Sequence, residues 1–561
     1  MGSRKRSDDR RQLRLLRSGV ILMAGAALLT KLIGALQKIP LQNLAGDRVF
    51  GIYNAVYPFY QLISVLATAG LPTAVSILIA HRLEEGGSEE GTRLTVAAAL
   101  LLLGVTGAVT FGLMWMSADL TASFIGDESA ALAIRILSVA LLFAPLVAVL
   151  RGYEQGKRRM GLSAASQVAE QVIRVAVMLL ALEVGLLAGW SDAKLAAGVM
   201  SGAAAGAAVA LLLLASRSWR PGSAKKRERM DAAPYPGKLL GEIRRLASFA
   251  GPAALASIVV PVIGVVDAFM VPRLLRESGM AEGAAMSLFG VYSRGGPLVQ
   301  LVTMVAGAAA AAMVPGLAAA KSQGAAQTLE LRLNMQLRAA WMAGGAAALG
   351  LVLLAEPLNV MLYKDAKGTT AFALVGCTAL AGSVSAVVAP ALQALGSARA
   401  PIALLLLAAL LKGALNAALV PSLGIEGAAL SGVVALSAAA MLGAAALRHA
   451  AAGLRPPHAP AWRRGPGLGP AAAGVMALAV MAASVLLAER GLSAALGQGL
   501  PPRGEAAALA LTGAAVGAVV FAAAALRGGV VSAREWRALP GGEAWAARLR
   551  RWRLIPPADE Q

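Results

Sequence analysis

The sequence is poor in charged residues, aromatic residues and cysteine, and each shortage excludes a class of protein or site. Only 14% of its 561 residues are charged and 4% are aromatic, whereas 58% are hydrophobic. A soluble domain carries about 25% charged residues, so this composition excludes an ordinary soluble protein. The single cysteine, Cys377, excludes an intramolecular disulfide. The three histidines lie far apart in the sequence, so we expect neither a metal site nor a cofactor.

Long apolar stretches recur from one end of the chain to the other. Each is close to the roughly 20 residues that an α-helix needs to cross a bilayer. Strands of a membrane barrel would alternate with a period of two, and these stretches do not. The sequence therefore predicts an all-α polytopic membrane protein. Its fourteen expected spans are 19–42, 49–80, 94–116, 131–150, 162–184, 195–216, 246–271, 284–318, 339–355, 369–394, 400–420, 424–447, 468–488 and 505–526.

Lys and Arg residues gather on one side of these spans. If the N-terminus is cytoplasmic, 37 of the 51 basic residues fall in the inner segments. Because positive charge stays on the cytoplasmic side, both termini are expected there. The net charge of +21 then reflects topology and contact with anionic lipid, and nucleic-acid binding is not expected.

An internal repeat divides the chain. The stretch FGIYNAVYPFYQL at 50–62 recurs as FGVYSRGGPLVQL at 289–301, with the Phe, Gly, Tyr, Pro, Gln and Leu in register. Six expected spans precede the basic segment 217–245, and the first six of the eight that follow it form the second half, so both halves have the same orientation. Transporters built from such parallel repeats place their substrate path between the halves.

The repeat predicts the following organisation. A basic cytoplasmic N-terminus and a basic C-terminal tail enclose two six-helix lobes and two extra helices. The segments are 1–18 (N-terminus), 19–216 (first lobe), 217–245 (cytoplasmic linker), 246–447 (second lobe), 448–467 (cytoplasmic loop), 468–526 (helices 13 and 14) and 527–561 (amphipathic tail).

Besides Lys38, near the end of the first span, five cations lie within the expected spans. They are Lys31, Arg135, Arg174, Arg294 and Lys412. A charge that faces lipid at mid-bilayer costs about 2.5–3.5 kcal/mol, so most of them must face a wet cavity, find a partner or reach an interface. Arg135 lies near a helix end, where it can extend to the interface.

Several of these charges form patterns along their helices. Lys31 and Lys38 are seven residues apart and share a helical face. Glu170 and Arg174 are four apart and can pair, so a structural role is as reasonable as a functional one. Lys412 and Asn416 have the same spacing, and for them too a structural and a functional role are equally reasonable. Together with Glu170, Arg174 and Asp267 they are the candidates for cavity or coupling residues.

The expected cavity is net positive. The first four spans contain no Asp or Glu, and the buried acids elsewhere are few. Lys and Arg in such a cavity are suited to an anion, above all a phosphate. The sequence shows no nucleotide-binding loop and no paired catalytic carboxylates, so it predicts a transporter and not an enzyme.

The motifs resemble those of a known family. They are the two copies of the repeat, RGYEQG at 151–156, SQVAEQ at 166–171 and GIEGAAL at 424–430. Over residues 19–450 the chain resembles the bacterial polysaccharide-export family, in its branch of stage V sporulation protein B and lipid II flippases. This branch belongs to the superfamily that also holds the multidrug-and-toxin exporters.

The resemblance implies two lobes around a V-shaped cavity and alternating access. It implies flipping of an undecaprenyl-pyrophosphate-linked, lipid II-like cell-wall precursor across the bacterial plasma membrane, with helices 13 and 14 lining a groove for the lipid tail. It also implies that Lys31 and Arg294 bind the pyrophosphate. Lys38 stands where the family's flippases carry a second arginine and is the third candidate.

Three other functions stay open. Another lipid-linked polysaccharide or a sporulation-specific glycan precursor fits the same motifs. A drug or cation antiporter would need carboxylates in the first lobe, and a membrane enzyme would need acidic residues on longer outer loops. The expected partners are the lipid-linked oligosaccharide and membrane lipids, with cell-wall synthesis proteins as a further class.

Overall fold

The chain is all-helical wherever its structure is described. The computed structural model describes residues 19, 22–68, 70–85, 89–218, 236–397, 399–452, 470–496, 500–530, 547–548 and 551. Every regular element among these residues is a helix, which confirms the predicted fold class. Four predicted segments lie wholly or mostly outside the described residues: the N-terminus 1–18, the tail beyond residue 530, and the segments 217–245 and 448–467.

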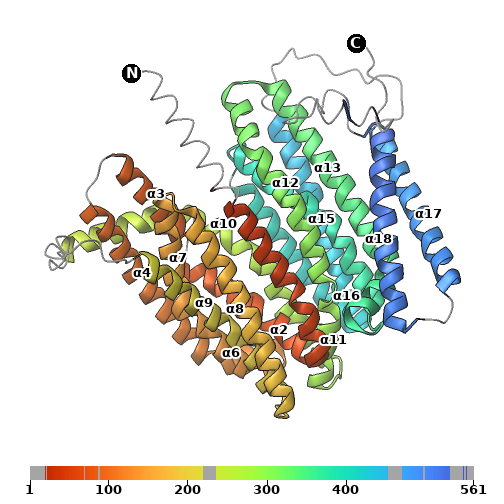
Figure 1. Cartoon of the computed structure of the whole chain (residues 1–561), viewed down its shortest axis with the longest axis horizontal. Helices are drawn as coiled ribbons and strands as arrows, with labels where there is room; N and C mark the ends of the chain where they lie inside the picture. Colours follow the sequence, from red (N-terminus) through yellow and green to blue (C-terminus); the bar gives the residue numbers. More distant parts are fainter. Residues whose placement is uncertain are drawn as a thin grey trace. The chain divides into compact units, whose positions relative to one another are not determined.

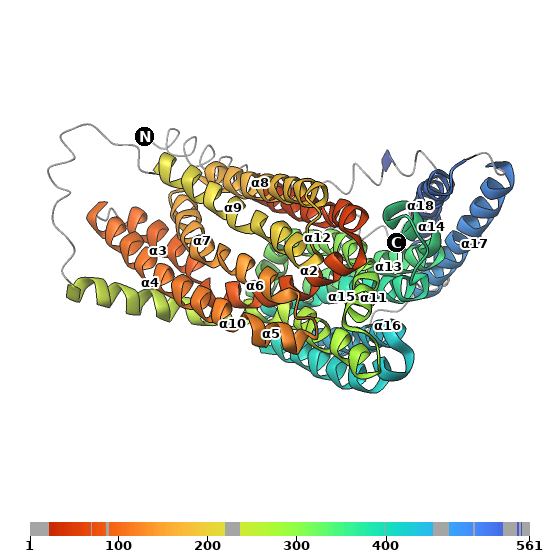
Figure 2. The same ribbon diagram turned by 90° about the horizontal axis from the view of Figure 1, so that it is seen from below.

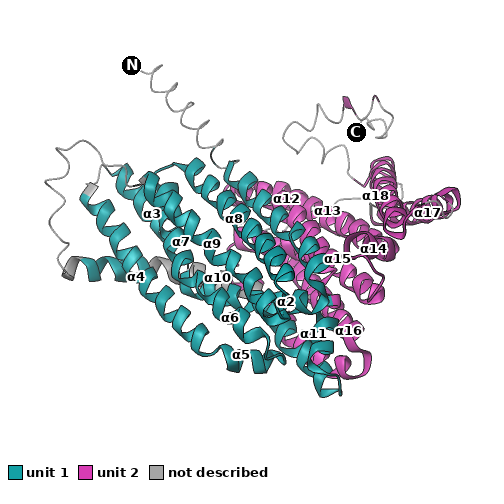
Figure 3. Ribbon diagram, turned by 60° about the horizontal axis from the view of Figure 1, so that its bottom comes forward, with its two compact units in different colours: residues 1–290 teal, residues 291–561 magenta. Residues whose placement is uncertain are grey.

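The described chain divides into two compact units, residues 1–290 and 291–561 (Figure 3). Residues 22–36 are helical and are followed in the first unit by α2 (Lys38–Thr68), α3 (Leu71–Glu84), α4 (Glu89–Met116), α5 (Ala118–Ile125), α6 (Ala130–Ser138), α7 (Ala140–Gly156), α8 (Met160–Leu187), α9 (Asp192–Ser218), α10 (Pro236–Glu277) and most of α11 (Glu282–Ser293). The second unit holds α12 (Gly296–Ser322), α13 (Ala326–Leu353), α14 (Ala355–Tyr363), α15 (Thr369–Ala394), α16 (Arg399–Ala452), α17 (Pro470–Leu496) and α18 (Pro502–Arg527).

The helix α10 belongs to the first unit, although it follows the 217–245 segment. It packs against α2, α3, α4 and α5. The boundary between the compact units, after residue 290, therefore lies later in the chain than the 217–245 segment that separates the two halves of the repeat. The lobe boundaries drawn from the repeat stay a prediction.

Ten segments of the described chain are long and apolar enough to cross a membrane. Two of them, Leu22–Glu84 and Arg399–Ala452, contain a break in helical geometry, at Gly46 (φ 80°) and Gly424 (φ 60°). These positive φ values favour glycine, which has no Cβ. The structure thus confirms a polytopic helical protein, but it does not confirm the expected number of fourteen spans.

Each unit is held together by close helix packing. In the first unit α8 lies along α9, as Figures 1 and 2 both show, and α7 packs on α3, α4 and α9. In the second unit α15 packs against α12, α13 and α16, and the α17–α18 hairpin lies on α13 and α14. Because lipid offers no hydrophobic driving force between helices, small residues that permit close approach stabilise such contacts.

Candidate functional site

A cluster of polar side chains lies inside the first unit around α8. The Glu170 carboxylate accepts hydrogen bonds from two arginines: Arg151 Nη2 on α7 donates to Oε2 at 2.8 Å, and Arg174 Nη2 donates to Oε1 at 2.9 Å. Arg151 Nε also donates to Ser166 Oγ at 2.9 Å. The three charged side chains are only 16–18% exposed, so each charge is held by direct partners.

The same polar contacts continue from α8 to α2. Arg174 Nη1 donates to the Tyr57 hydroxyl at 3.1 Å. Gln171 Nε2 donates to Gln37 Oε1 at 3.2 Å, and Gln37 Nε2 donates to the Tyr53 hydroxyl at 3.0 Å. The Tyr53 and Tyr57 rings stack with centroids 5.5 Å apart and 9° between their planes. Hydrogen bonds of the α8 side chains therefore connect this helix to α7, to α2 and to the turn before α2.

We call this connected set the α8 cluster. Its members are Gln37, Tyr53, Tyr57, Arg151, Ser166, Glu170, Gln171 and Arg174.

Two glycines of α9 fix the position of α8. A Cβ at Gly206 would lie 2.5 Å from the carbonyl oxygen of Glu170, and a Cβ at Gly202 would overlap the carbonyl oxygen of Arg174. The backbones of α8 and α9 are thus in contact where the charged side chains of the cluster begin. This contact holds Glu170 and Arg174 on a rigid support.

The cluster has a positive excess and a spare donor. It contains two guanidinium groups and one carboxylate. Arg174 Nε and Gln167 Oε1 are buried and have no hydrogen-bond partner among the described residues. A buried donor without a partner costs about 1–3 kcal/mol. An anionic group is the ligand that arginine donors favour, so the cluster is chemically suited to an anion.

The two lysines of the first span differ in their surroundings. Lys38 adjoins the α8 cluster: it follows Gln37, is partly buried, and its Nζ donates to Asn54 Oδ1 at 2.9 Å. Lys31 is exposed on the helix 22–36, and the described residues include no hydrogen-bond or ion-pair partner for it. The face between them lies along α8, because a Cβ at Gly34 would lie 3.5 Å from Gln171 Nε2.

Arg294 is enclosed and paired in the second unit. It lies at the break between α11 and α12 and is fully buried. Its Nη1 donates to Asp365 Oδ1 at 2.6 Å and to Asn359 Oδ1 at 3.3 Å, and its Nη2 donates to Asp365 Oδ2 at 3.3 Å. The Tyr363 hydroxyl donates to its carbonyl oxygen at 2.8 Å. The binding of pyrophosphate by Arg294 therefore stays a prediction, and it would require the second anion to displace Asp365 from the guanidinium.

The pairing with Arg294 lowers the pKa of the Asp365 carboxyl. Burial alone would raise the pKa of Asp365. The hydrogen bonds from Arg294 and from the backbone N–H of Lys367, together with their positive charges, outweigh burial and hold the pKa below its usual value. Asp365 is therefore ionised and neutralises Arg294.

The remaining predicted residues lie at separate places in their units. Lys412 on α16 is 4% exposed, and its Nζ donates to the Tyr292 hydroxyl at 3.4 Å. Asn416, one turn later, is fully buried, and Asp267 on α10 is 8% exposed. A role for these three in coupling stays a prediction.

Sequence reasoning missed Arg151, Tyr53 and Tyr57 as site residues. All three lie in the quoted motifs RGYEQG and FGIYNAVYPFYQL. The expected span 131–150 stops just before Arg151, whereas α7 continues to Gly156. The usable signal was the spacing of Glu170 and Arg174, which identified α8 as a charged helix.

Comparisons with known proteins identify relatives over most of the chain. A family model described as Polysaccharide biosynthesis protein matches residues 16–321. The uncharacterised membrane protein YabM of Bacillus subtilis (strain 168) is 32% identical over 414 residues, which cover 74% of this chain and 76% of that one. Stage V sporulation protein B and lipid II flippase MurJ of the same organism are 26% and 24% identical, over 74% of this chain and 80% and 79% of theirs.

Solved structures share the fold. The inward closed conformation of lipid II flippase MurJ matches with a TM-score of 0.61 at 12% identity, over 89% of this chain and 98% of that chain. The inward-facing conformation of a multidrug resistance MATE family transporter of the MOP superfamily matches with a TM-score of 0.60 at 17% identity, over 77% of this chain and 96% of that chain. At these identities the matches show the fold alone.

Proposed function

The chain belongs to the polysaccharide biosynthesis protein family, and on that premise we propose that it flips an undecaprenyl-pyrophosphate-linked, lipid II-like cell-wall precursor between membrane leaflets. The coarser statement, a multi-pass membrane transporter of lipid-linked precursors, follows from its relatives and its fold. The identity of the precursor is the proposal.

The observation that carries this proposal is the positive excess of the α8 cluster within a membrane-spanning unit. Arg151 and Arg174 face one carboxylate, that of Glu170, and Lys38 adjoins them. A diphosphate carries two or more negative charges and many acceptor oxygens, so it can satisfy donors that Glu170 leaves free. A neutral or cationic substrate would leave the positive excess of the cluster, two guanidinium groups against one carboxylate, without compensation.

We assign Lys38, Lys31 and Arg174 to the diphosphate. Lys38 needs only to exchange its hydrogen bond to Asn54 for one to a phosphate oxygen. Lys31, which is exposed on the preceding helix 22–36, would capture the headgroup first. Glu170 holds Arg174 in place while the site is empty.

In the proposed cycle the two lobes rock so that the site opens to one side of the membrane and then to the other. The prenyl tail stays in lipid, and the sugar headgroup leaves with the diphosphate. We place the protein in the bacterial plasma membrane with both termini in the cytoplasm, as the distribution of Lys and Arg indicates.

A second candidate is the export of another lipid-linked glycan for sporulation. The relative named stage V sporulation protein B, 26% identical over 417 residues, favours it. It differs from the first candidate in the sugar and not in the diphosphate, so the same cationic residues would serve it.

Complementation tests the proposal. One charge-assisted hydrogen bond contributes about 1.5–3 kcal/mol, so Lys31→Ala and Lys38→Ala should each slow transport at least about tenfold. Neither variant should then support growth of a strain depleted of its own lipid II flippase. The matched control is Arg135→Ala, which removes another predicted in-span cation whose exposed partner is Asp119. Normal growth with both lysine variants, at wild-type protein levels, would overturn the assignment.

A further inference from the structure

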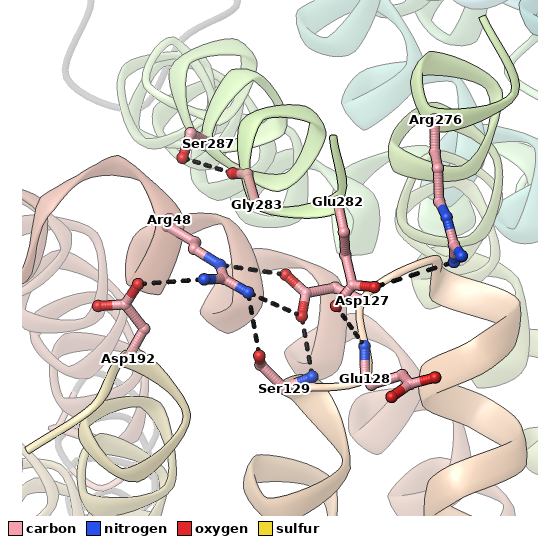
Figure 4. A network of polar contacts seen from close by, with 9 residues as sticks. All are labelled: Arg48, Asp127, Glu128, Ser129, Asp192, Arg276, Glu282, Gly283 and Ser287. Carbon is pink, nitrogen blue, oxygen red and sulfur yellow. Dashed lines mark hydrogen bonds and ion pairs between the residues drawn. The ribbon is translucent and has the colours of Figure 1, made fainter. Parts of the chain in front are cut away.

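The charged side chains at one end of the first unit are matched by one another (Figure 4). Arg48 Nε lies 3.4 Å from Asp127 Oδ2, and Arg48 Nη1 lies 3.5 Å from Asp192 Oδ2. The Glu282 carboxylate lies 4.0 Å from Arg276 Nη1 on α10. Each of these charges has an opposite charge beside it, so this network does not call for a ligand.

A pocket in the second unit has charges of both signs at its edge and an apolar base. It has a volume of about 230 Å³ and lies between the start of α13 and the end of α16. Its lining from α13 follows one helical face, at spacings of three, four and seven residues. The residues that line it are Glu330, Leu333, Asn334 and Leu337 from α13, and Leu447, Arg448, Ala451 and Ala452 from α16. We call it the α13–α16 pocket.

The base and the edge of this pocket differ in polarity. Leu333, Leu337 and Leu447 are 2–4% exposed and belong to the hydrophobic core of the second unit. Glu330 at the edge is half-buried, whereas Arg448 is exposed, and the described residues include no hydrogen-bond or ion-pair partner for Arg448. The pocket therefore suits a molecule with a charged head and an apolar stem.

Helix lengths place the pocket at the level of the lipid headgroups. The helix α13 has 28 residues, so at about 1.5 Å per residue it is about 42 Å long. The hydrocarbon core of a bilayer is only about 30 Å thick. Glu330 lies in the first two turns of α13 and Arg448 in the last two turns of α16, so both lie near the ends of membrane-competent helices.

We propose that the α13–α16 pocket binds the headgroup of one phosphatidylethanolamine molecule, as a resident lipid that is not transported. Arg448 pairs with the phosphate, Glu330 accepts hydrogen bonds from the ammonium group, and the glycerol end of the acyl chains lies on the leucines. This site goes beyond the proposed function and does not depend on it.

The chemistry of the edge favours this headgroup over other phospholipids. A guanidinium binds a phosphate well, and a primary ammonium has three N–H donors for a carboxylate and for the Asn334 amide oxygen. The quaternary ammonium of phosphatidylcholine has no N–H donor, and phosphatidylglycerol has no positive charge to place beside Glu330. The pocket is also smaller than the roughly 300–1,000 Å³ that encloses a drug-sized ligand, so it suits a headgroup and not a glycan.

Native mass spectrometry of the full-length protein in detergent tests the site. Dioleoyl phosphatidylethanolamine, phosphatidylcholine and phosphatidylglycerol are each titrated, and we expect the first to bind at least about threefold more tightly than the other two. Arg448→Gln should weaken its binding by a similar factor. Glu330→Gln should remove its advantage over phosphatidylglycerol. The matched control is Arg399→Gln, which removes an exposed arginine at the other end of α16 and should change nothing.

A variant that fills the pocket separates its shape from its charges. Ala451→Leu leaves Glu330 and Arg448 in place and should weaken phosphatidylethanolamine binding, and it decides the matter together with Glu330→Gln if Arg448→Gln does not fold. Equal affinities for the three lipids, or tightest binding of phosphatidylglycerol, would overturn the site. Pocket variants that all bind phosphatidylethanolamine like the unmutated protein would overturn it as well. None of these results bears on the flippase proposal, and failure of flipping assays would leave this site standing.

Discussion

Arg294 shows how the free-energy cost of burying a charge in a membrane protein is offset by an ion pair. Its sequence position within an apolar run correctly indicated that the charge needs compensation. The compensation comes from Asp365, 71 residues later, in the loop between α14 and α15. Spacing along one helix can reveal partners such as Glu170 and Arg174, but it cannot reveal a partner on another element.

The Arg294–Asp365 pair predicts a pH-dependent stability. Asp365→Asn leaves the buried guanidinium without a countercharge, which should cost about 1–3 kcal/mol at pH 7, because Asp365 is itself one-third exposed. The pKa of Asp365 is lower in the folded protein than in the unfolded chain. Its contribution is therefore present above the unfolded pKa of about 3.9 and is lost as the pH falls through the lower folded value.

Thermal unfolding in detergent from pH 7 to pH 3 measures this effect. The melting temperature of Asp365→Asn should be lower than that of the unmutated protein at pH 7. The difference should shrink below about pH 4, because the ordinary pKa of Asp is about 3.9. Asp119→Asn, whose side chain is 72% exposed, is the control and should melt like the unmutated protein. Equal melting temperatures for Asp365→Asn and the unmutated protein at pH 7 would show that Arg294 needs no countercharge.

At the scale of elements, the apolar pattern predicts helices well and helix breaks poorly. The expected span 162–184 corresponds to α8, Met160–Leu187, and the expected span 369–394 matches α15 in full. The expected span 284–318, however, is divided at Arg294 into α11 and α12. The Tyr363 hydroxyl satisfies the Arg294 carbonyl oxygen at this break, and no local sequence signal reports a tertiary hydrogen bond.

The α2–α11 contact gives a prediction about packing. Gly51→Ala would place a methyl group against the Met286 carbonyl oxygen, a backbone atom that cannot rotate away. Such overpacking typically costs about 1–3 kcal/mol, so the variant should unfold several degrees earlier. The control is Gly112→Ala in α4, where no atom lies within 4 Å and the helix should gain roughly 0.5–1 kcal/mol. Equal melting temperatures for the two variants would contradict the close approach of α2 and α11.

The candidate site can be predicted only in part from the sequence, because hydrogen bonds between helices leave no local signal. Lys38, Glu170 and Arg174 were identified because a charge in an apolar helix is conspicuous. Tyr53, Tyr57 and Gln37 were not, because such residues are common in helices and acquire a role only through their cross-helix hydrogen bonds. The sequence thus indicates which helix carries charge, and the fold decides which neighbours complete the cluster.

At the scale of the whole molecule, the family match and the structural matches agree on one membrane-protein fold. The family model matches residues 16–321, and the relatives and the MurJ structure match 74% and 89% of the chain. The proposed substrate rests on the charge of the site. The account therefore depends on the α8 cluster and Lys38 recognising a diphosphate.

Flipping in reconstituted vesicles tests that claim most directly. The purified protein is given one labelled glycan on either undecaprenyl diphosphate or undecaprenyl monophosphate, and the accessible fraction in each leaflet is followed over time. We expect the diphosphate-linked lipid to move at least about tenfold faster, and Lys38→Ala to remove most of this preference. Equal rates for the two lipids, or a preference that survives Lys38→Ala unchanged, would contradict the account.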